Sequence, residues 1–159
     1  MRKYQFLIIA TVFVLDRLTK LVVVHNIPLG HNIAVIPGLF QLSHWENPGA
    51  AFSMFAESES RWRTAGLIAF SVVVIVIVAA LLWRTTKRIG LTEVALSLIA
   101  GGALGNLWDR VAKTTVTDFL DFYIGPHHWP PFNVADSAIV VGGLLLLARI
   151  LWPSQPEKS

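Results

Sequence analysis

The sequence contains no cysteine, so disulfide bonds, thiol catalysis and cysteine-ligated metal sites are excluded. It also lacks HExxH, GxSxG and glycine-rich phosphate-binding motifs, which would indicate a zinc protease, a serine hydrolase or a nucleotide site. The five histidines are scattered except for the adjacent His127 and His128, which we interpret as polar residues of a membrane interface. We therefore expect no metal and no cofactor.

Charged residues are scarce: they make up 14% of the 159 residues, whereas 54% are hydrophobic. A transmembrane helix needs about 20 mostly apolar residues. Four segments approach this requirement, namely residues 4–24, 64–83, 91–108 and 134–152. Long apolar runs without alternating polarity favour helices over the strands of a barrel. The sequence predicts an all-α integral membrane protein with four transmembrane helices, forming a single membrane domain over residues 1–159.

The placement of lysine and arginine predicts the orientation. Basic residues lie near both termini and between the second and third segments: Arg2, Lys3, Arg84, Lys87, Arg88, Arg149 and Lys158. The positive-inside rule assigns these regions, and so both termini, to the cytoplasm. The first segment resembles a secretory signal, but Asp16, Arg17 and Lys20 stand where a cleavage site would belong, so we expect an uncleaved span. The net charge of +3 fits this topology and anionic lipid, and no basic run interleaved with aromatics indicates nucleic acid.

Residues 25–63 and 110–133 are predicted to lie on the extracytoplasmic side. The first of these segments alternates turn signals with short β-prone pieces such as NIAVI and LFQLS, which predicts a small β platform at the membrane surface. Its end, residues 52–63, mixes apolar and charged side chains as a short interfacial helix does. We expect it to act as a mobile lid, and a static surface anchor for the second apolar segment is the alternative.

Two aspartates stand at the outer margins of the apolar segments on this same side, Asp118 in VTDF and Asp136 in FNVAD, which opens the fourth segment. An ionisable group at a membrane span is costly enough to indicate a function, and each aspartate is the candidate partner of the other. Two carboxyl groups within about 3 Å share a proton, so that one is an acid and the other a base near neutral pH. Such a pair can activate water against a peptide carbonyl. For Asp136, three residues after Asn133 at a helix start, a favourable contact with the helix dipole is the alternative.

Further polar residues are expected at the same outer end. Asp16 and Lys20 are four apart and therefore share a helix face. They either neutralise each other so that the first segment can insert, or take part directly in the site. Asn106 shares a face with both Asp109 and Arg110 on the third segment. A helix cap or an interface anchor is the alternative account of Asp109 and Arg110.

The motifs DRLTK, ENPGAAFS, GGALGNLWDR, VTDF and FNVADS, in this order, resemble those of the bacterial lipoprotein signal peptidases (signal peptidase II) over nearly the whole chain. The resemblance implies an aspartyl endopeptidase of the bacterial inner membrane, with its active site near the extracytoplasmic surface. Its implied substrates are diacylglyceryl-modified prolipoproteins, cleaved immediately before the lipidated cysteine, and its other partner is membrane lipid. We expect a monomer.

Carried over residue by residue, the resemblance implies that Asp118 and Asp136 are the catalytic pair. The positions implied to line and support the site are Asp16, Lys20, Asn47, Gly49, Asn106, Arg110 and Asn133. Family members often read NTGAAF where this chain reads NPGAAF, and Pro48 removes one backbone donor and stiffens the approach to Gly49.

Two other functions are compatible with acids near membrane spans. A small proton-coupled transporter subunit would distribute its charged residues through the depth of the bilayer, whereas here the acids gather at one surface. A noncatalytic membrane assembly factor would need the helix interfaces but neither Asp118 nor Asp136.

Overall fold

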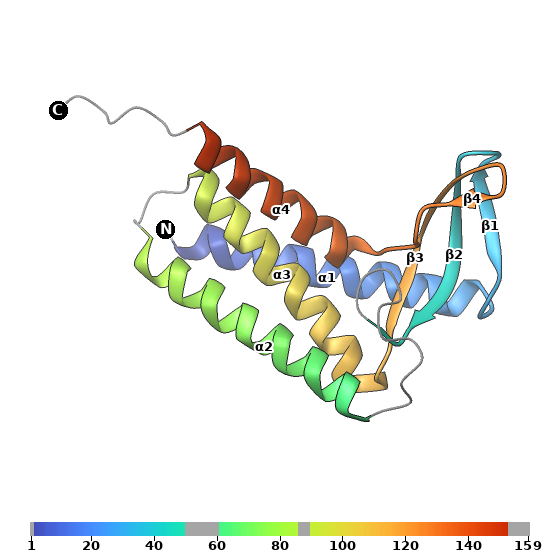
Figure 1. The fold of residues 1–159 in the computed structure, drawn as a ribbon, viewed down its shortest axis with the longest axis horizontal. Coiled ribbons are helices and arrows are strands. Elements are labelled where there is room, and N and C mark those ends of the chain that lie inside the picture. Colours follow the sequence, from blue (N-terminus) through green and yellow to red (C-terminus); the bar gives the residue numbers. More distant parts are fainter. Residues whose placement is uncertain (1, 50–60, 86–89, 153–159) are drawn as a thin grey trace.

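The computed structural model describes residues 2–49, 61–85 and 90–152. Helices form a bundle, and a small sheet lies at one end of it (Figure 1). The helices are α1 (Arg2–Asn26), α2 (Arg61–Arg84), α3 (Leu91–Lys113) and α4 (Val134–Leu151). The strands are β1 (Asn32–Ile36), β2 (Phe40–Asn47), β3 (Val116–Ile124) and β4 (His127–His128). The start of α1, the end of α2 and the end of α4 all lie at the end of the bundle that is opposite to the sheet (Figure 1).

Helix α3 is the centre of the bundle, because it packs against α1, α2 and α4. Glycines allow its backbone to approach two neighbours closely. A Cβ atom at Gly101 would lie 2.8 Å from Cβ of Val12 on α1, and one at Gly102 would collide with the carbonyl oxygen of Ala135 on α4. The polar side chains of α3 are consequently within reach of both neighbouring helices.

Three helices within the described residues are long and apolar enough to cross a membrane: α2 from Trp62 onward, α3 and α4. In the most apolar stretches of α2 and α4, only 11% and 17% of the residues are buried. Their outward faces carry large apolar side chains, as lipid-facing helices do. Helix α1 is 25 residues long but carries Asp16, Arg17 and Lys20 in its second half. The membrane character of the chain is thus evident from three helices, and α1 differs from them in charge.

The sheet has the strand order β1-β2-β3-β4 with antiparallel neighbours. It docks onto the end of α1 through a buried apolar cluster of Val23, Ile27 and Phe119. Helix α3 is followed by its C-cap Thr114, which adopts the left-handed conformation (φ 66°) and donates its N–H to the carbonyl oxygen of Arg110 at 3.1 Å. This turn directs the chain into β3.

The predicted β platform is present, but its composition differs from the expectation. We expected strands in residues 25–63 alone, whereas β3 and β4 come from residues 110–133. Helix α3 also continues to Lys113, beyond the expected end at residue 108. Most of the predicted interfacial helix and lid, residues 52–60, lies outside the described residues, and Arg61 and Trp62 are already part of α2.

Candidate active site

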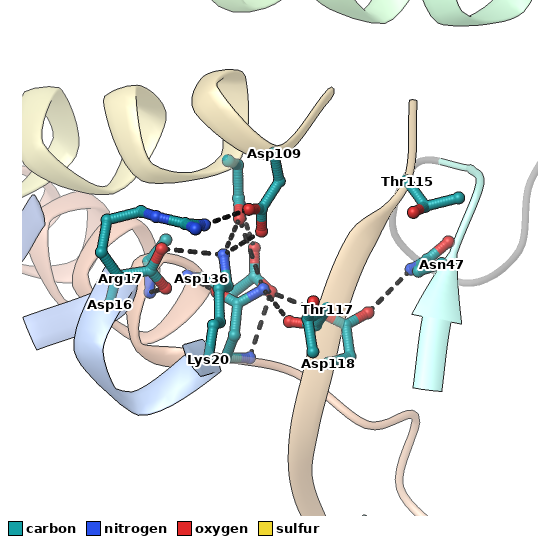
Figure 2. A network of polar contacts seen from close by, with 12 residues as sticks. Asp16, Arg17, Lys20, Asn47, Asp109, Thr115, Thr117, Asp118 and Asp136 are labelled. Atoms are coloured by element: carbon teal, nitrogen blue, oxygen red, sulfur yellow. Dashed lines mark hydrogen bonds and ion pairs between the residues drawn. The ribbon is translucent and has the colours of Figure 1, made fainter. Parts of the chain in front are cut away.

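The polar face of α1 is buried within the bundle. Asp16 and Lys20 are 0% and 1% exposed, and Lys20 Nζ lies 2.8 Å from Asp16 Oδ2, so the expected i, i+4 pair is formed. Lys20 Nζ also lies 2.9 Å from Asp109 Oδ2 on α3, and Arg17 forms a second ion pair with Asp109 (Figure 2). For Asp109 the sequence left a helix cap or an interface anchor open as an alternative to a role in the site. In the structure it is the buried counter-ion that joins α3 to α1.

Asn106 connects this charged cluster to Asp136. Lys20 Nζ donates to Asn106 Oδ1 at 3.1 Å, which fixes the orientation of the amide. Asn106 Nδ2 then donates to Asp136 Oδ1 at 2.7 Å. Because the lysine can only donate, the amide must present its oxygen to Lys20 and its nitrogen to Asp136.

Asn133 joins the two aspartates. It is the N-cap of α4: Asp136 N donates to Asn133 Oδ1 at 2.9 Å, and Asn133 N donates back to Asp136 Oδ2 at 3.3 Å. The side-chain nitrogen of Asn133, Nδ2, donates to Asp118 Oδ1 at 2.7 Å. The capping box therefore does more than begin a helix, since it holds Asp118 of β3 next to Asp136 of α4.

Asp118 is 4% exposed and receives a second amide from the neighbouring strand β2. Asn47 Nδ2 at the end of β2 donates to Asp118 Oδ2 at 2.9 Å, and Asn47 Oδ1 accepts from Gly49 N at 2.9 Å (Figure 2). Pro48 does not prevent this turn, because the turn uses the N–H of Gly49 and not that of residue 48. Burial, and then the neighbouring charge of Asp136, raise the pKa of Asp118 from 3.8 to about 7.

Asp16 and Arg110 complete the surroundings. Asp16 Oδ1 accepts the backbone N–H of Ala135 at 3.0 Å, so it binds the first turn of α4 next to Asp136. Arg110 on α3 interacts electrostatically with Asp136, Asp118 and Asp109, and it is partly buried. All nine residues expected at the site from the sequence are thus gathered in one region, at the sheet end of the bundle.

The charges of this region nearly balance. Four carboxyl groups and three cationic groups are linked within the described residues: Asp16, Asp109, Asp118 and Asp136 with Arg17, Lys20 and Arg110. One proton on a carboxyl group makes the set neutral, which favours a single shared proton in a buried site. Among the residues that the structure describes, no cluster of three or more histidine and acidic side chains could hold a metal ion.

The sequence matches the family described as signal peptidase (SPase) II over residues 8–152, and the chain belongs to this family. It is 45% identical to the lipoprotein signal peptidase of Solibacter usitatus over 146 residues, covering 92% of this chain and 89% of the relative. It is 38% identical to that of Klebsiella aerogenes over 154 residues, covering 96% and 91%.

The fold agrees with this membership. A solved structure described as a bacterial membrane enzyme superposes with a TM-score of 0.86 at 27% identity, covering 99% of this chain and 94% of its own. A second structure of the same description gives a TM-score of 0.83 at 26% identity. The protein is therefore a membrane aspartic peptidase of the type that processes lipoproteins.

Proposed function

We propose that this protein removes signal peptides from diacylglyceryl-modified prolipoproteins, and that Asp118 and Asp136 hydrolyse the bond that precedes the lipidated cysteine. The family supports the substrate class. The observation that carries the assignment of the residues is the contact of Asn133 with both carboxyl groups, at 2.7 Å to Asp118 and 3.3 Å to Asp136. It fixes the two acids side by side.

The environments of the two acids suggest which one carries the proton. With a pKa of about 7, Asp118 is about half protonated at neutral pH and largely protonated below it. Asp136 accepts hydrogen bonds from the Asn106 amide and the Asn133 backbone and faces Arg110, so it is held in place as a general base must be. We assign Asp118 as the acid and Asp136 as the base.

The reaction then follows from these two states. Asp136 removes a proton from a water molecule as its oxygen adds to the scissile carbonyl carbon, while Asp118 donates its proton to the carbonyl oxygen. The resulting gem-diol collapses: the C–N bond breaks, Asp136 transfers its proton to the leaving nitrogen, and Asp118 recovers a proton from a hydroxyl of the gem-diol. Both acids return to their starting states.

The remaining residues act through these two. Lys20 holds Asn106, and Asn106 holds Asp136, so the charged cluster between α1 and α3 orients the base. Asp16 binds the N–H of Ala135 and positions the turn that carries Asp136. Asn47 orients the acid. Arg110 provides the positive charge that offsets the developing oxyanion, as fixed cations do in hydrolytic sites.

The proposed setting is the bacterial inner membrane, crossed by all four helices. The sheet end would face the extracytoplasmic side, and both termini and the α2–α3 link would face the cytoplasm, as the basic residues predict. In this arrangement α1 crosses the membrane because its charges are paired inside the bundle. The apolar signal segment and the acyl chains would reach the site laterally from lipid, and a monomer suffices for this route.

The two rival functions account less well for these contacts. A proton-coupled transporter needs ionisable groups along a path through the bilayer, whereas the four acids lie together at the sheet end (Figure 2). A noncatalytic assembly factor would gain nothing from a buried acid with a raised pKa.

The test uses purified protein in lipid nanodiscs with a diacylglyceryl-modified precursor, and it identifies the N-terminus of the product by mass spectrometry. The wild type should release a product that begins with the lipidated cysteine. Asp118→Asn and Asp136→Asn should each lose cleavage by about 1,000-fold or more, because removing one member of a coupled catalytic unit removes its function.

Asp121→Asn is the matched control. Asp121 is a buried carboxylate of β3 that accepts from Gln41 and contacts His128, away from the pair. It should retain cleavage. Activity above a few per cent in either Asp118→Asn or Asp136→Asn, or equal turnover of the unlipidated precursor, would contradict the proposal.

A further inference from the structure

Glu46, the residue before Asn47, forms a polar cluster on the face of the sheet that is opposite to Asp118. Its Oε1 accepts from Lys113 Nζ at 2.8 Å and from Thr117 Oγ1 at 2.9 Å, and its Oε2 accepts from Thr115 Oγ1 at 2.5 Å. Lys113 also donates to Thr117, which is fully buried. One carboxylate thus binds the end of α3, the connection after it and the start of β3.

The strand register explains why this cluster bears on the site. Glu46 lies directly opposite Thr117 in the β2–β3 pair. Because successive side chains point to opposite faces of a sheet, the next residues along the two strands, Asn47 and Asp118, share the other face. There Asn47 Nδ2 contacts Asp118 Oδ2 (Figure 2). The dipeptides Glu46–Asn47 of β2 and Thr117–Asp118 of β3 are therefore joined on both faces of the sheet. The Glu46 carboxylate joins them on one face, and the Asn47 amide joins them on the other.

We propose that Glu46 is a positioning residue for the reaction: it fixes the end of β2 against the start of β3 and so holds the Asn47 amide on Asp118. The proposal rests on the assignment of Asp118 as a catalytic acid. The motif ENPGAAFS begins with Glu46 and the motif VTDF contains Thr117, but neither residue, nor Thr115, is among the expected site residues.

The charges around Glu46 support a permanent anion. Lys113 Nζ and His44 Nε2 face it, the latter at 3.5 Å from Oε1. Burial raises the pKa of Glu46, but the hydrogen bonds from Lys113, Thr115 and Thr117 outweigh this effect, so that the pKa is lowered overall. The carboxylate therefore keeps its three donors throughout the pH range in which Asp118 titrates.

The direction in which the pH profile of kcat shifts distinguishes a positioning role of Glu46 from a direct effect of its charge on Asp118. Asp118 is faced by Asp136, Lys20, Asn47, Asn133 and Arg110. The Asn47 hydrogen bond lowers the pKa of Asp118, so losing it raises this pKa. Removing the negative charge of Glu46 through space alone would lower it. Activity requires protonated Asp118, so positioning predicts that the alkaline limb of kcat moves to higher pH.

The decisive variant is Glu46→Gln, which keeps the size of the side chain but removes its charge and one acceptor oxygen. We expect kcat to fall about ten-fold with KM within about two-fold, because misplacement of a reacting group affects the chemical step. The alkaline limb of the kcat profile should rise by about half a pH unit. Thr115→Val, which removes one donor, should change both quantities in the same direction by less, and it carries the test if Glu46→Gln does not fold.

A double-mutant cycle tests whether Glu46 acts through Asn47. Glu46→Gln in the Asn47→Ala background should add nothing to the loss in Asn47→Ala, whereas independent roles would multiply. Asp121→Asn, a carboxylate removed from the same sheet, should leave the pH profile unchanged.

Three results would overturn the positioning role of Glu46. They are an unchanged kcat and pH profile in Glu46→Gln, a shift of the alkaline limb of kcat to lower pH, and a loss in the double variant equal to the product of the two single losses. If these occur while Asp118→Asn is inactive, only the role of Glu46 is wrong. An active Asp118→Asn would instead refute the proposed function itself.

Discussion

A Cβ atom at Gly105 of α3 would lie 2.6 Å from Oδ2 of Asp16 on α1, so these two positions fit together only without a side chain at residue 105. The same atom would lie 3.2 Å from Cβ of Ala135, whose N–H Asp16 accepts. Asp16 cannot move away freely, because Lys20 holds the same oxygen at 2.8 Å. The close approach of α1 and α3 at Gly105 and the hydrogen bonds of Asp16 therefore depend on each other.

Gly105→Ala should displace Asp16, break its contact with Ala135 and shift the turn that carries Asp136. We expect cleavage of the lipidated precursor to fall about 100-fold, as a displacement of about 1 Å can cause, together with a lower melting temperature. Gly143→Ala on α4 is the matched control, since nothing lies within 4 Å of a Cβ atom there. A Gly105→Ala enzyme as active and as stable as Gly143→Ala would contradict this packing.

The raised pKa of Asp118 predicts how stability depends on pH. Between 3.8 and about 7 the folded protein keeps a proton that the unfolded chain has released. The stability that this proton contributes is thus fully present below pH 3.8 and is lost as the pH rises to about 7. At about 1.4 kcal/mol per pKa unit, the wild type should lose up to about 3 kcal/mol relative to Asp118→Asn between pH 5 and pH 8. Thermal unfolding of both proteins in one detergent measures the difference, and a pH-independent difference would refute the shift.

Replacing Lys20 by methionine should be severely destabilising. Lys20 is 1% exposed and is the shared cation of Asp16 and Asp109, so its loss leaves two buried carboxylates facing each other with Arg17 as the remaining partner of Asp109. Breaking a buried ion pair from one side costs about 3–5 kcal/mol. Adding Asp16→Asn to the Lys20→Met variant should recover part of the melting temperature without recovering activity. Lys3→Met, an exposed change on the same helix, should alter neither.

The proposed topology can be tested because the native chain has no cysteine. Single cysteines replacing His31, beside the sheet, and Thr85, after α2, should behave oppositely. In intact cells an impermeant maleimide should label the first and not the second, and permeabilised cells should label both. Labelling of Thr85→Cys with protection of His31→Cys would reverse the orientation.

The helices could be predicted because long apolar runs leave few alternatives. Asp118 and Asp136 could be recognised because carboxyl groups beside apolar spans are costly. Strand β3 was not predicted: VTDFLDFYI is rich in β-branched and aromatic residues, but it also contains two aspartates, a residue type that is depleted in strands.

The partners of the charged residues were harder to predict. Asp109 lies 89 residues from Lys20 in the sequence (109 − 20), and only the packing of α1 on α3 brings them together. A signal did exist: α1 has two cations, Arg17 and Lys20, but the single acid Asp16 near them, so a second acid was needed from another helix. Glu46 belongs to the motif ENPGAAFS, but the contacts of its side chain could not be predicted, because its partners depend on the register of β2 and β3.

The buried contact of Arg17 and Lys20 with Asp109 also constrains how the chain is made. Arg17 and Asp109 are 92 residues apart, so the ribosome releases α1 long before its counter-ion exists. In a bilayer crossed by α1, the first helix to be synthesised would be the least stable until α3 arrives, and α2 would be inserted in the meantime. If α1 crosses the bilayer, it would have to wait in a hydrated or protein-lined environment, and completion of the fold would then require the first helix to be retained until the third has been delivered.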